Sequence, residues 1–245
     1  KQGFTEEDLI DFTPELRAVA ARAVAGYRMG ALYTPPSLEG TLLMPGLIGG
    51  AGWGGGAVDP SSGSLYVKAT NSPAMIRLYR PPQSDTVQGE YSFDRTATLR
   101  FGDLDARDIA RIGGVPDGLP FNKPPYGTLT AIDLGSGDHR WQVAAGDDPT
   151  IRNHPLLAGR TLPRLGAGGA PGPMVTAGGL VFLTGGGNAL EAYDTDTGAL
   201  VWSADLGARG YANPMTYATR DGRQFVAIAT GGGADAILKV FALPK

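Results

Sequence analysis

The chain has 245 residues, enough to bury a sizeable core as one or two domains. A net charge of −3 gives no basic surface for nucleic acid, no apolar run approaches the length of about 18 residues that spans a membrane, and the absence of cysteine excludes disulfides, thiolate metal sites and a cysteine nucleophile. The 38 glycines and 19 prolines, with an ordinary apolar content of 42%, indicate a turn-rich all-β protein with many short strands.

The segment "TPELRAVAARAVAGYRMG" (13–30) predicts an amphipathic helix in this otherwise β-rich chain. Thr13 is the expected N-cap and Pro14 the first helical residue. Apolar residues follow at helical spacing in one stripe: Leu16, Val19, Ala20, Ala23, Val24 and Tyr27. The stripe indicates a face packed on the structure that follows, although a face for another protein would show the same pattern. We expect residues 1–46 to form a helical arm and an extended lead-in to residues 47–245.

The glycine-rich segment "GGAGWGGGAVDP" (49–60) satisfies the dinucleotide fingerprint G-x-G-x-x-G. That fingerprint needs a helix after it, because the helix N-terminus holds the pyrophosphate. Here residues 57–70, "AVDPSSGSLYVKAT", indicate strand, turn and strand instead. The segment is therefore expected to be a corner between strands rather than a nucleotide loop.

Two later segments repeat one another without a gap, "LTAIDLGSGDHRWQVAAG" (129–146) and "LEAYDTDTGALVWSADLG" (190–207). The matching pairs include Asp133/Asp194, Gly137/Gly198 and Trp141/Trp202. Each copy predicts a hairpin in which the aspartate accepts backbone N–H bonds across the turn and the glycine supplies its positive-φ residue. The tryptophan is expected to pack against the next repeat.

A glycine-marked hairpin precedes each copy, so the repeating unit has four strands, which is the signature of a β-propeller. The expected blades are 53–146 with an insert at 71–124, 172–207, and 212–243 without its last strand. Three blades cannot close a ring. We expect the chain to be a piece of a larger protein or to close by pairing with another chain, for example by head-to-tail self-association.

The repeated motif A-x-D-x-x-[ST]-G-x-x-x-W resembles the blade-docking tryptophan motif of the quinoprotein dehydrogenases, which carry pyrroloquinoline quinone (PQQ) at the centre of an eight-bladed propeller. Five further segments match the glucose-dehydrogenase-like branch in order: "YRMGALYTPPSLEGTLLMPG" (27–46), "WGGGAVDP" (53–60), "KPPYGTLTAIDL" (123–134), "GPMVTAGGLVF" (172–182) and "PMTYATRDGRQFVAIATGGG" (214–233). The chain resembles the C-terminal part of such an enzyme.

The resemblance implies three turns that face the propeller axis, at residues 49–56, 165–174 and 231–233, and the first two carry the candidate cofactor-binding residues. The first is the 49–56 segment, where Trp53 would stack on the quinone or seal it from water and where Gly52 replaces the polar residue, often Asn, usual in the family. The second is the 165–174 loop, where Gly169, Ala170 and Pro171 would line the cofactor edge. A corner whose tryptophan only packs between blades is the alternative.

No catalytic residue and no metal ligand is assigned within this chain, because the family supplies its base and calcium ligands upstream. Asp59, Asp133 and Asp194 are expected to be turn residues. The acids Asp103, Asp105 and Asp108 lack the central glycine and terminal glutamate of an EF-hand and are expected to be a solvated charge run.

The resemblance implies a segment of an enzyme that oxidises a sugar or alcohol hydroxyl by hydride transfer to PQQ, with calcium bound outside this chain and a quinone or cytochrome as electron acceptor. It also implies a periplasmic location. As an isolated fragment the chain is expected to be inactive. The alternative from another class is a non-catalytic propeller scaffold that binds protein partners in the bacterial envelope.

Overall fold

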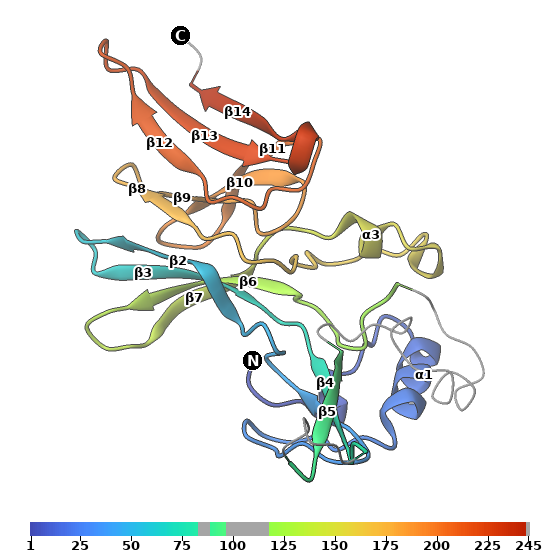
Figure 1. Cartoon of the computed structure of the whole chain (residues 1–245). Coiled ribbons are helices and arrows are strands. Elements are labelled where there is room, and N and C mark those ends of the chain that lie inside the picture. The colour runs from blue at the N-terminus through green and yellow to red at the C-terminus, as the bar shows by residue number, and fades with distance from the viewer. Residues whose placement is uncertain (83–88, 97–117, 244–245) are drawn as a thin grey trace. The chain divides into compact units, whose positions relative to one another are not determined.

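The computed structural model describes residues 1–82, 89–96 and 118–243 (Figure 1). The acids Asp103, Asp105 and Asp108 lie outside the described residues. The chain forms two compact units. The first comprises residues 1–50, 71–124 and 153–160, and the second comprises residues 51–70, 125–152 and 161–245.

The first unit contains the predicted helix. Its elements are η1 (Glu6–Asp8), α1 (Pro14–Val24), β1 (Thr41–Leu43), β4 (Ala74–Tyr79), β5 (Ser92–Thr96) and η3 (Pro155–Leu157). The Thr13 side chain accepts a hydrogen bond from the Leu16 amide at 3.1 Å, which is the N-cap that the sequence predicts. The helix buries Leu16, Ala20, Ala23 and Val24. No helix in the described ranges is long and apolar enough to cross a bilayer.

A small sheet joins the lead-in to the insert. Strand β1 pairs antiparallel with β4, with Leu42 opposite Met75, and β4 pairs with β5. The sequence prediction assigned no strand to the lead-in, because three residues are too short to show an alternation. The insert therefore builds its own sheet with residues that lie more than thirty positions earlier in the chain.

The second unit consists of three antiparallel sheets. The first is β2 (Ala51–Asp59), β3 (Ser64–Thr70), β6 (Gly127–Asp133) and β7 (His139–Ala144); the second is β8 (Met174–Thr176), β9 (Leu180–Leu183), β10 (Ala189–Asp194) and β11 (Leu200–Asp205); the third is β12 (Met215–Ala218), β13 (Gln224–Thr230) and β14 (Ile237–Ala242). Short helices α3 (Pro149–Arg152) and η4 (Gly233–Asp235) lie in the connections. Each sheet is a meander in chain order, the strand arrangement that a propeller blade has, and the predicted all-β fold is confirmed.

The blade-closing hairpins have the predicted turn chemistry. The carboxylate of Asp133 accepts from the amides of Gly135 at 2.8 Å and Ser136 at 3.1 Å. The carboxylate of Asp194 does the same in the second copy, with amide distances of 3.1 and 2.9 Å. The amide bonds hold the pKa of the Asp133 carboxyl below its ordinary value, and the hydroxyl of Thr197 together with the amides does the same for the Asp194 carboxyl. Both aspartates therefore stabilise the hairpin turns in which they lie.

Trp141 docks the first blade onto the second. Its indole N–H donates to the carbonyl of Thr195 at 2.9 Å, and its ring lies so close to Gly198 that a Cβ there would be 2.7 Å away. Trp141 also packs on Tyr66, with ring centroids 5.8 Å apart. The turn glycine of one repeat thus lies directly against the tryptophan ring of the preceding repeat.

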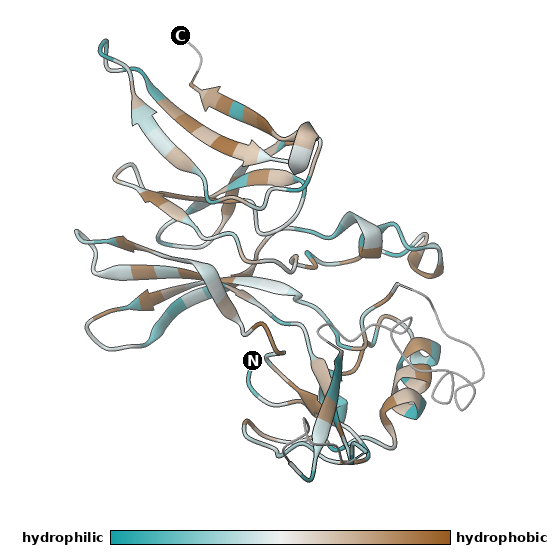
Figure 2. Cartoon of the chain, in the orientation of Figure 1, coloured by the Kyte–Doolittle hydropathy of each residue, from teal (hydrophilic) through white to brown (hydrophobic). Residues whose placement is uncertain are grey.

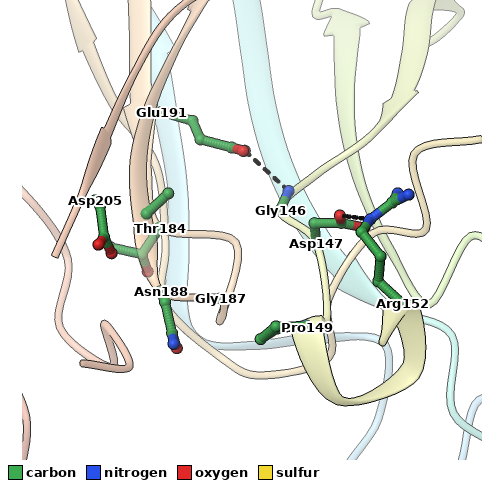
Figure 3. Close-up of a pocket in the computed structure, with 10 residues that line it drawn as sticks. Gly146, Asp147, Pro149, Arg152, Thr184, Gly187, Asn188, Glu191 and Asp205 are labelled. Atoms are coloured by element: carbon green, nitrogen blue, oxygen red, sulfur yellow. Dashed lines mark hydrogen bonds and ion pairs between the residues drawn. The ribbon is translucent and has the colours of Figure 1, made fainter. Parts of the chain in front are cut away.

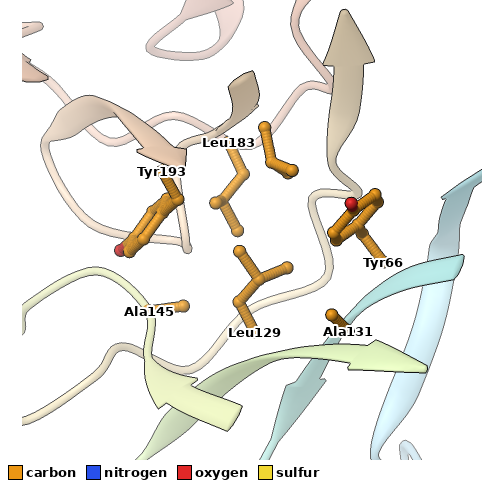
Figure 4. Close-up of a cluster of buried hydrophobic side chains, with 7 residues drawn as sticks. Tyr66, Leu129, Ala131, Ala145, Leu183 and Tyr193 are labelled. Atoms are coloured by element: carbon orange, nitrogen blue, oxygen red, sulfur yellow. The ribbon is translucent and has the colours of Figure 1, made fainter. Parts of the chain in front are cut away.

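The main core of this unit lies between the first two blades (Figure 4). It consists of Tyr66, Leu129, Ala131, Ala145, Val181, Leu183 and Tyr193. Strand β3 contributes through strict alternation, since Ser64, Tyr66, Lys68 and Thr70 are buried and the residues between them are half-buried. A lysine therefore occupies an inward-facing position of this strand.

The third sheet has an unpaired edge. Among the described strands, β14 pairs with β13 alone, and two of its apolar side chains remain exposed, Leu238 at 67% and Val240 at 45%. Figure 2 shows mostly hydrophobic residues along β13 and β14. The sheet thus ends one strand short of the four that the other blades have.

Candidate functional site

The glycine-rich corner is a wide irregularity in β2. Ala51 pairs with Ala69 and Gly56 pairs with Val67, so residues 52–55 bulge out opposite the single residue Lys68. Trp53 lies in this bulge and is fully exposed, at 102% of its reference area. Trp53 does not pack between the blades of this chain.

The corner is built against the 169–172 loop. The amide of Gly54 donates to the carbonyl of Ala170 at 3.1 Å. A Cβ on Gly54 would lie 2.1 Å from the Gly172 amide nitrogen, and one on Gly52 would lie 3.2 Å from Cβ of Ala170. Glycine is therefore required where the two backbones cross.

Asn213, which precedes the third sheet, holds the two backbones together. Its side-chain amide donates to the carbonyl of Gly54 at 2.8 Å, and its side-chain carbonyl accepts from the amide of Gly172 at 2.6 Å. The segments that begin all three sheets therefore meet at one point.

The predicted cofactor-facing residues differ in exposure. The structure brings Gly52 and Ala170 into contact and places Trp53 beside them in the chain. Ala170 is exposed, Gly169 is half-buried and Pro171 is buried. Trp53 and Ala170 thus present the open face of the corner, whereas Pro171 supports it from within.

Two residues that the sequence prediction missed lie behind the corner, Lys68 and Thr70. The Lys68 side chain is 3% exposed, and its ammonium donates to the carbonyl of Gly169 and, at 3.1 Å, to the hydroxyl of Thr70. The Thr70 hydroxyl also donates to the Gly169 carbonyl at 2.9 Å and accepts from the Gly169 amide at 3.2 Å. Burial lowers the pKa of Lys68 to about 8. The alternation from Tyr66 along β3 was the available signal for Lys68.

A cavity of about 310 Å³ lies elsewhere in the second unit, beside Glu191 (Figure 3). The buried Glu191 carboxylate accepts from Arg164 at 2.7 Å, from the Gly146 amide at 3.0 Å and from the Tyr193 hydroxyl. Burial and the Glu191 charge raise the pKa of Tyr193, while Glu191 raises the pKa of Arg164 against the effect of burial. The carboxylate is fully engaged, so it serves to anchor the connection after β7.

The part of the chain that the structure describes shows no cluster of metal-binding side chains. No three His, Cys, Asp or Glu side chains gather there in a group that could hold a metal ion. His139 is exposed at the start of β7, and the His154 ring accepts a hydrogen bond from the Leu156 amide as the cap of η3.

The glycine-rich corner offers a one-sided platform for a flat ligand, with an indole and closely spaced backbone groups.

Comparison with known proteins matches residues 1–226 to the family model described as "PQQ: Glucose/ethanol/alcohol dehydrogenase, beta-propeller domain". The large subunit of glycerol dehydrogenase from Gluconobacter oxydans is 36% identical over 82% of this chain and 28% of its own length. The quinate/shikimate dehydrogenase (quinone) of Acinetobacter baylyi is 28% identical over 94% of this chain and 29% of its own length. The quinoprotein glucose dehydrogenase of Escherichia coli is 31% identical over 84% and 26%.

The chain thus spans less than a third of the length of each of these curated relatives. The resemblance inferred from the ordered motifs is confirmed by the family match.

Proposed function

Because the chain belongs to the PQQ family of glucose, ethanol and alcohol dehydrogenases, we propose that it is the C-terminal part of a quinoprotein dehydrogenase that oxidises a sugar or alcohol hydroxyl. PQQ supplies the hydride acceptor for this oxidation when it is bound. The family match supports this function rather than a non-catalytic scaffold. The observation that supports a PQQ-binding site in this chain is the corner formed by residues 52–55.

The corner fits one side of a PQQ site. Apart from Trp53 the residues of the bulge are glycines, so no other side chain of residues 52–55 stands in the way of a flat ring. The exposed indole of Trp53 offers an aromatic face, and the 169–171 segment forms the adjoining wall, with Gly169 and Ala170 accessible and Pro171 buried beneath them. Because Gly52 has no side chain, the corner contributes shape and backbone groups rather than a polar side chain at that position.

The remaining parts of the site belong, in this proposal, to blades upstream of this chain. They supply the base that takes the hydroxyl proton, the ligands of a calcium ion and the strands that close the propeller. A quinone or a cytochrome accepts the electrons, and the enzyme works in the periplasm. The blade limits 53–146, 172–207 and 212–243 are part of the same proposal.

A PQQ titration with calcium present tests the site, with tryptophan fluorescence as the readout. The chain has three tryptophans, so Trp141→Phe and Trp202→Phe are matched controls for Trp53→Phe. We expect saturable quenching that shrinks in Trp53→Phe and persists in both controls, because only Trp53 lies at the corner. Quenching that is unchanged in Trp53→Phe, with the variant folded by circular dichroism, would contradict the assignment.

The same protein preparation tests whether substrate oxidation needs the upstream blades. We expect no dye-linked oxidation of sugars or alcohols by the 245-residue chain alone and oxidation once the upstream blades are added. Turnover by the chain alone would show that a base and a metal site lie within it, against the proposal.

A further inference from the structure

Lys68 is a buried cation at the back of the corner. It is the one residue of β3 that stands opposite the bulge of residues 52–55. Its side chain is 3% exposed, so it reaches neither solvent nor the open face on which Trp53 lies. Its ammonium contacts the carbonyl of Gly169, the residue next to the exposed Ala170.

Both hydrogen-bond partners of this ammonium in the described structure are neutral, a backbone carbonyl and the Thr70 hydroxyl. Among the described residues, the segments that meet Lys68 add no charged side chain: the bulge of β2 is glycine apart from Trp53, Leu129 of β6 pairs with Lys68, and residues 165–172 carry no ionisable side chain. These neutral acceptors bind two of the three N–H donors of the ammonium, and they leave its charge uncompensated. Buried charges in proteins are normally paired, because desolvation without a counter-ion is costly.

We propose that Lys68 is a positioning residue whose ammonium holds the Gly169 carbonyl in place and makes the corner selective for an anionic ligand. The inference rests on the proposed function, and it names the anion as the carboxylates that PQQ carries on its ring system. The charge acts through the 169–170 loop rather than by contact, and its field is strong because little water separates it from the corner. The bound carboxylates supply the counter-charge that the described chain does not.

The test compares PQQ with its uncharged trimethyl ester in the full-length enzyme that contains this chain. Dissociation constants of both ligands are measured by fluorescence quenching at fixed calcium for the wild type, Lys68→Met and Lys68→Arg. We expect Lys68→Met to weaken PQQ binding about tenfold and ester binding less than about threefold, as the loss of one favourable charge interaction requires. Lys68→Arg keeps the charge and is expected to keep the preference for PQQ. The added bulk of the ester groups affects all variants alike. The fold-change in the dissociation constant of PQQ, divided by the fold-change for the ester, therefore reports the effect of the Lys68 charge.

Three outcomes overturn the proposal. Equal weakening of both ligands in Lys68→Met would mean that Lys68 only supports the loop. Unchanged binding of both would mean that it does not influence the corner. If neither ligand binds the wild type, the proposed function itself fails, which the wild-type titration alone reveals. Should Lys68→Met not fold, Lys68→Gln provides the same comparison, since it also removes the charge and retains a hydrogen-bond donor for Gly169.

Discussion

At Gly54 the backbone of one blade passes so close to that of the next that a Cβ would lie 2.3 Å from the carbonyl oxygen of Ala170. No other residue type fits there without moving β2 or the 169–172 loop. The same crossing leaves the Trp53 indole without packing partners and places Lys68 behind it. At the scale of the residue, the corner thus combines glycines in the bulge with the buried Lys68 ammonium behind it.

The depressed pKa of Lys68 makes stability depend on pH. The folded chain releases the proton near pH 8, whereas the unfolded chain releases it near the ordinary value of 10.5. Between these values the unfolded state binds more protons, so the free energy of unfolding rises with pH, by up to about 3 kcal/mol. Below pH 8 the charged Lys68 destabilises the fold by the same amount.

We therefore expect Lys68→Met to be more stable than the wild type at pH 7 and the difference to shrink as pH rises from 8 to 10.5. Urea denaturation across this range measures it, and the difference between the two proteins removes the contribution of the tyrosines and other lysines. Parallel stability curves for the two proteins would show that Lys68 is not desolvated in solution.

At the scale of the element, the two matching hairpins have different surroundings. The first hairpin places Trp141 on the turn of the second, where the indole finds both a carbonyl and a glycine. The second hairpin places Trp202 against Phe241 of the third sheet, with ring centroids 5.4 Å apart, and leaves it 40% exposed. The same motif is therefore fully docked in one repeat and half docked in the next.

Removal of the two indole groups should have unequal costs. Trp141→Phe loses the bond to Thr195 and leaves that carbonyl with the Tyr66 hydroxyl as donor, at 3.4 Å. We therefore expect it to destabilise the 245-residue chain by about 1–3 kcal/mol more than Trp202→Phe. Urea denaturation followed by circular dichroism measures the difference. Equal costs would mean that the docking of Trp141 is not formed in solution.

At the scale of the whole molecule, the exposed edge of β14 determines how the chain behaves in solution. Unpaired strand edges with apolar side chains add strands from other chains. The edge carries exposed Leu238 and Val240, and its other neighbour in the sheet is absent from the described structure. The chain therefore presents a surface suited to another strand, from an upstream blade or from a second copy.

We expect the isolated chain, with a monomer mass of 25.4 kDa, to associate as its concentration rises. Leu238→Glu should weaken this association, because it places a charge on the edge. Leu134→Glu is the matched control, since Leu134 is also exposed but lies in a hairpin turn. Light scattering coupled to size exclusion measures the mass. A monomer at every concentration would contradict the prediction.

Local features of the fold could be predicted from the amino-acid order. The Thr13 cap of α1 and the aspartate–glycine turns depend on contacts between residues close in sequence, and the four-strand unit shows itself as a repeated sequence pattern; each was confirmed. The corner could also be located, because glycine clusters and a lone tryptophan are visible in the sequence. Its assignment to PQQ came from the resemblance and stays a prediction.

Only the tertiary structure revealed what surrounds the corner. Lys68 meets Gly169 across 101 residues, and Asn213 meets Gly54 across 159 residues. The pairing of β1 with β4 likewise joins the lead-in to the insert. The sequence alone determined which segments repeat, turn and bend, because those preferences are local. Which side chains lie behind the bend, and that one of them is a buried and uncompensated cation, depends on how distant segments pack, and composition and spacing carry no record of that packing.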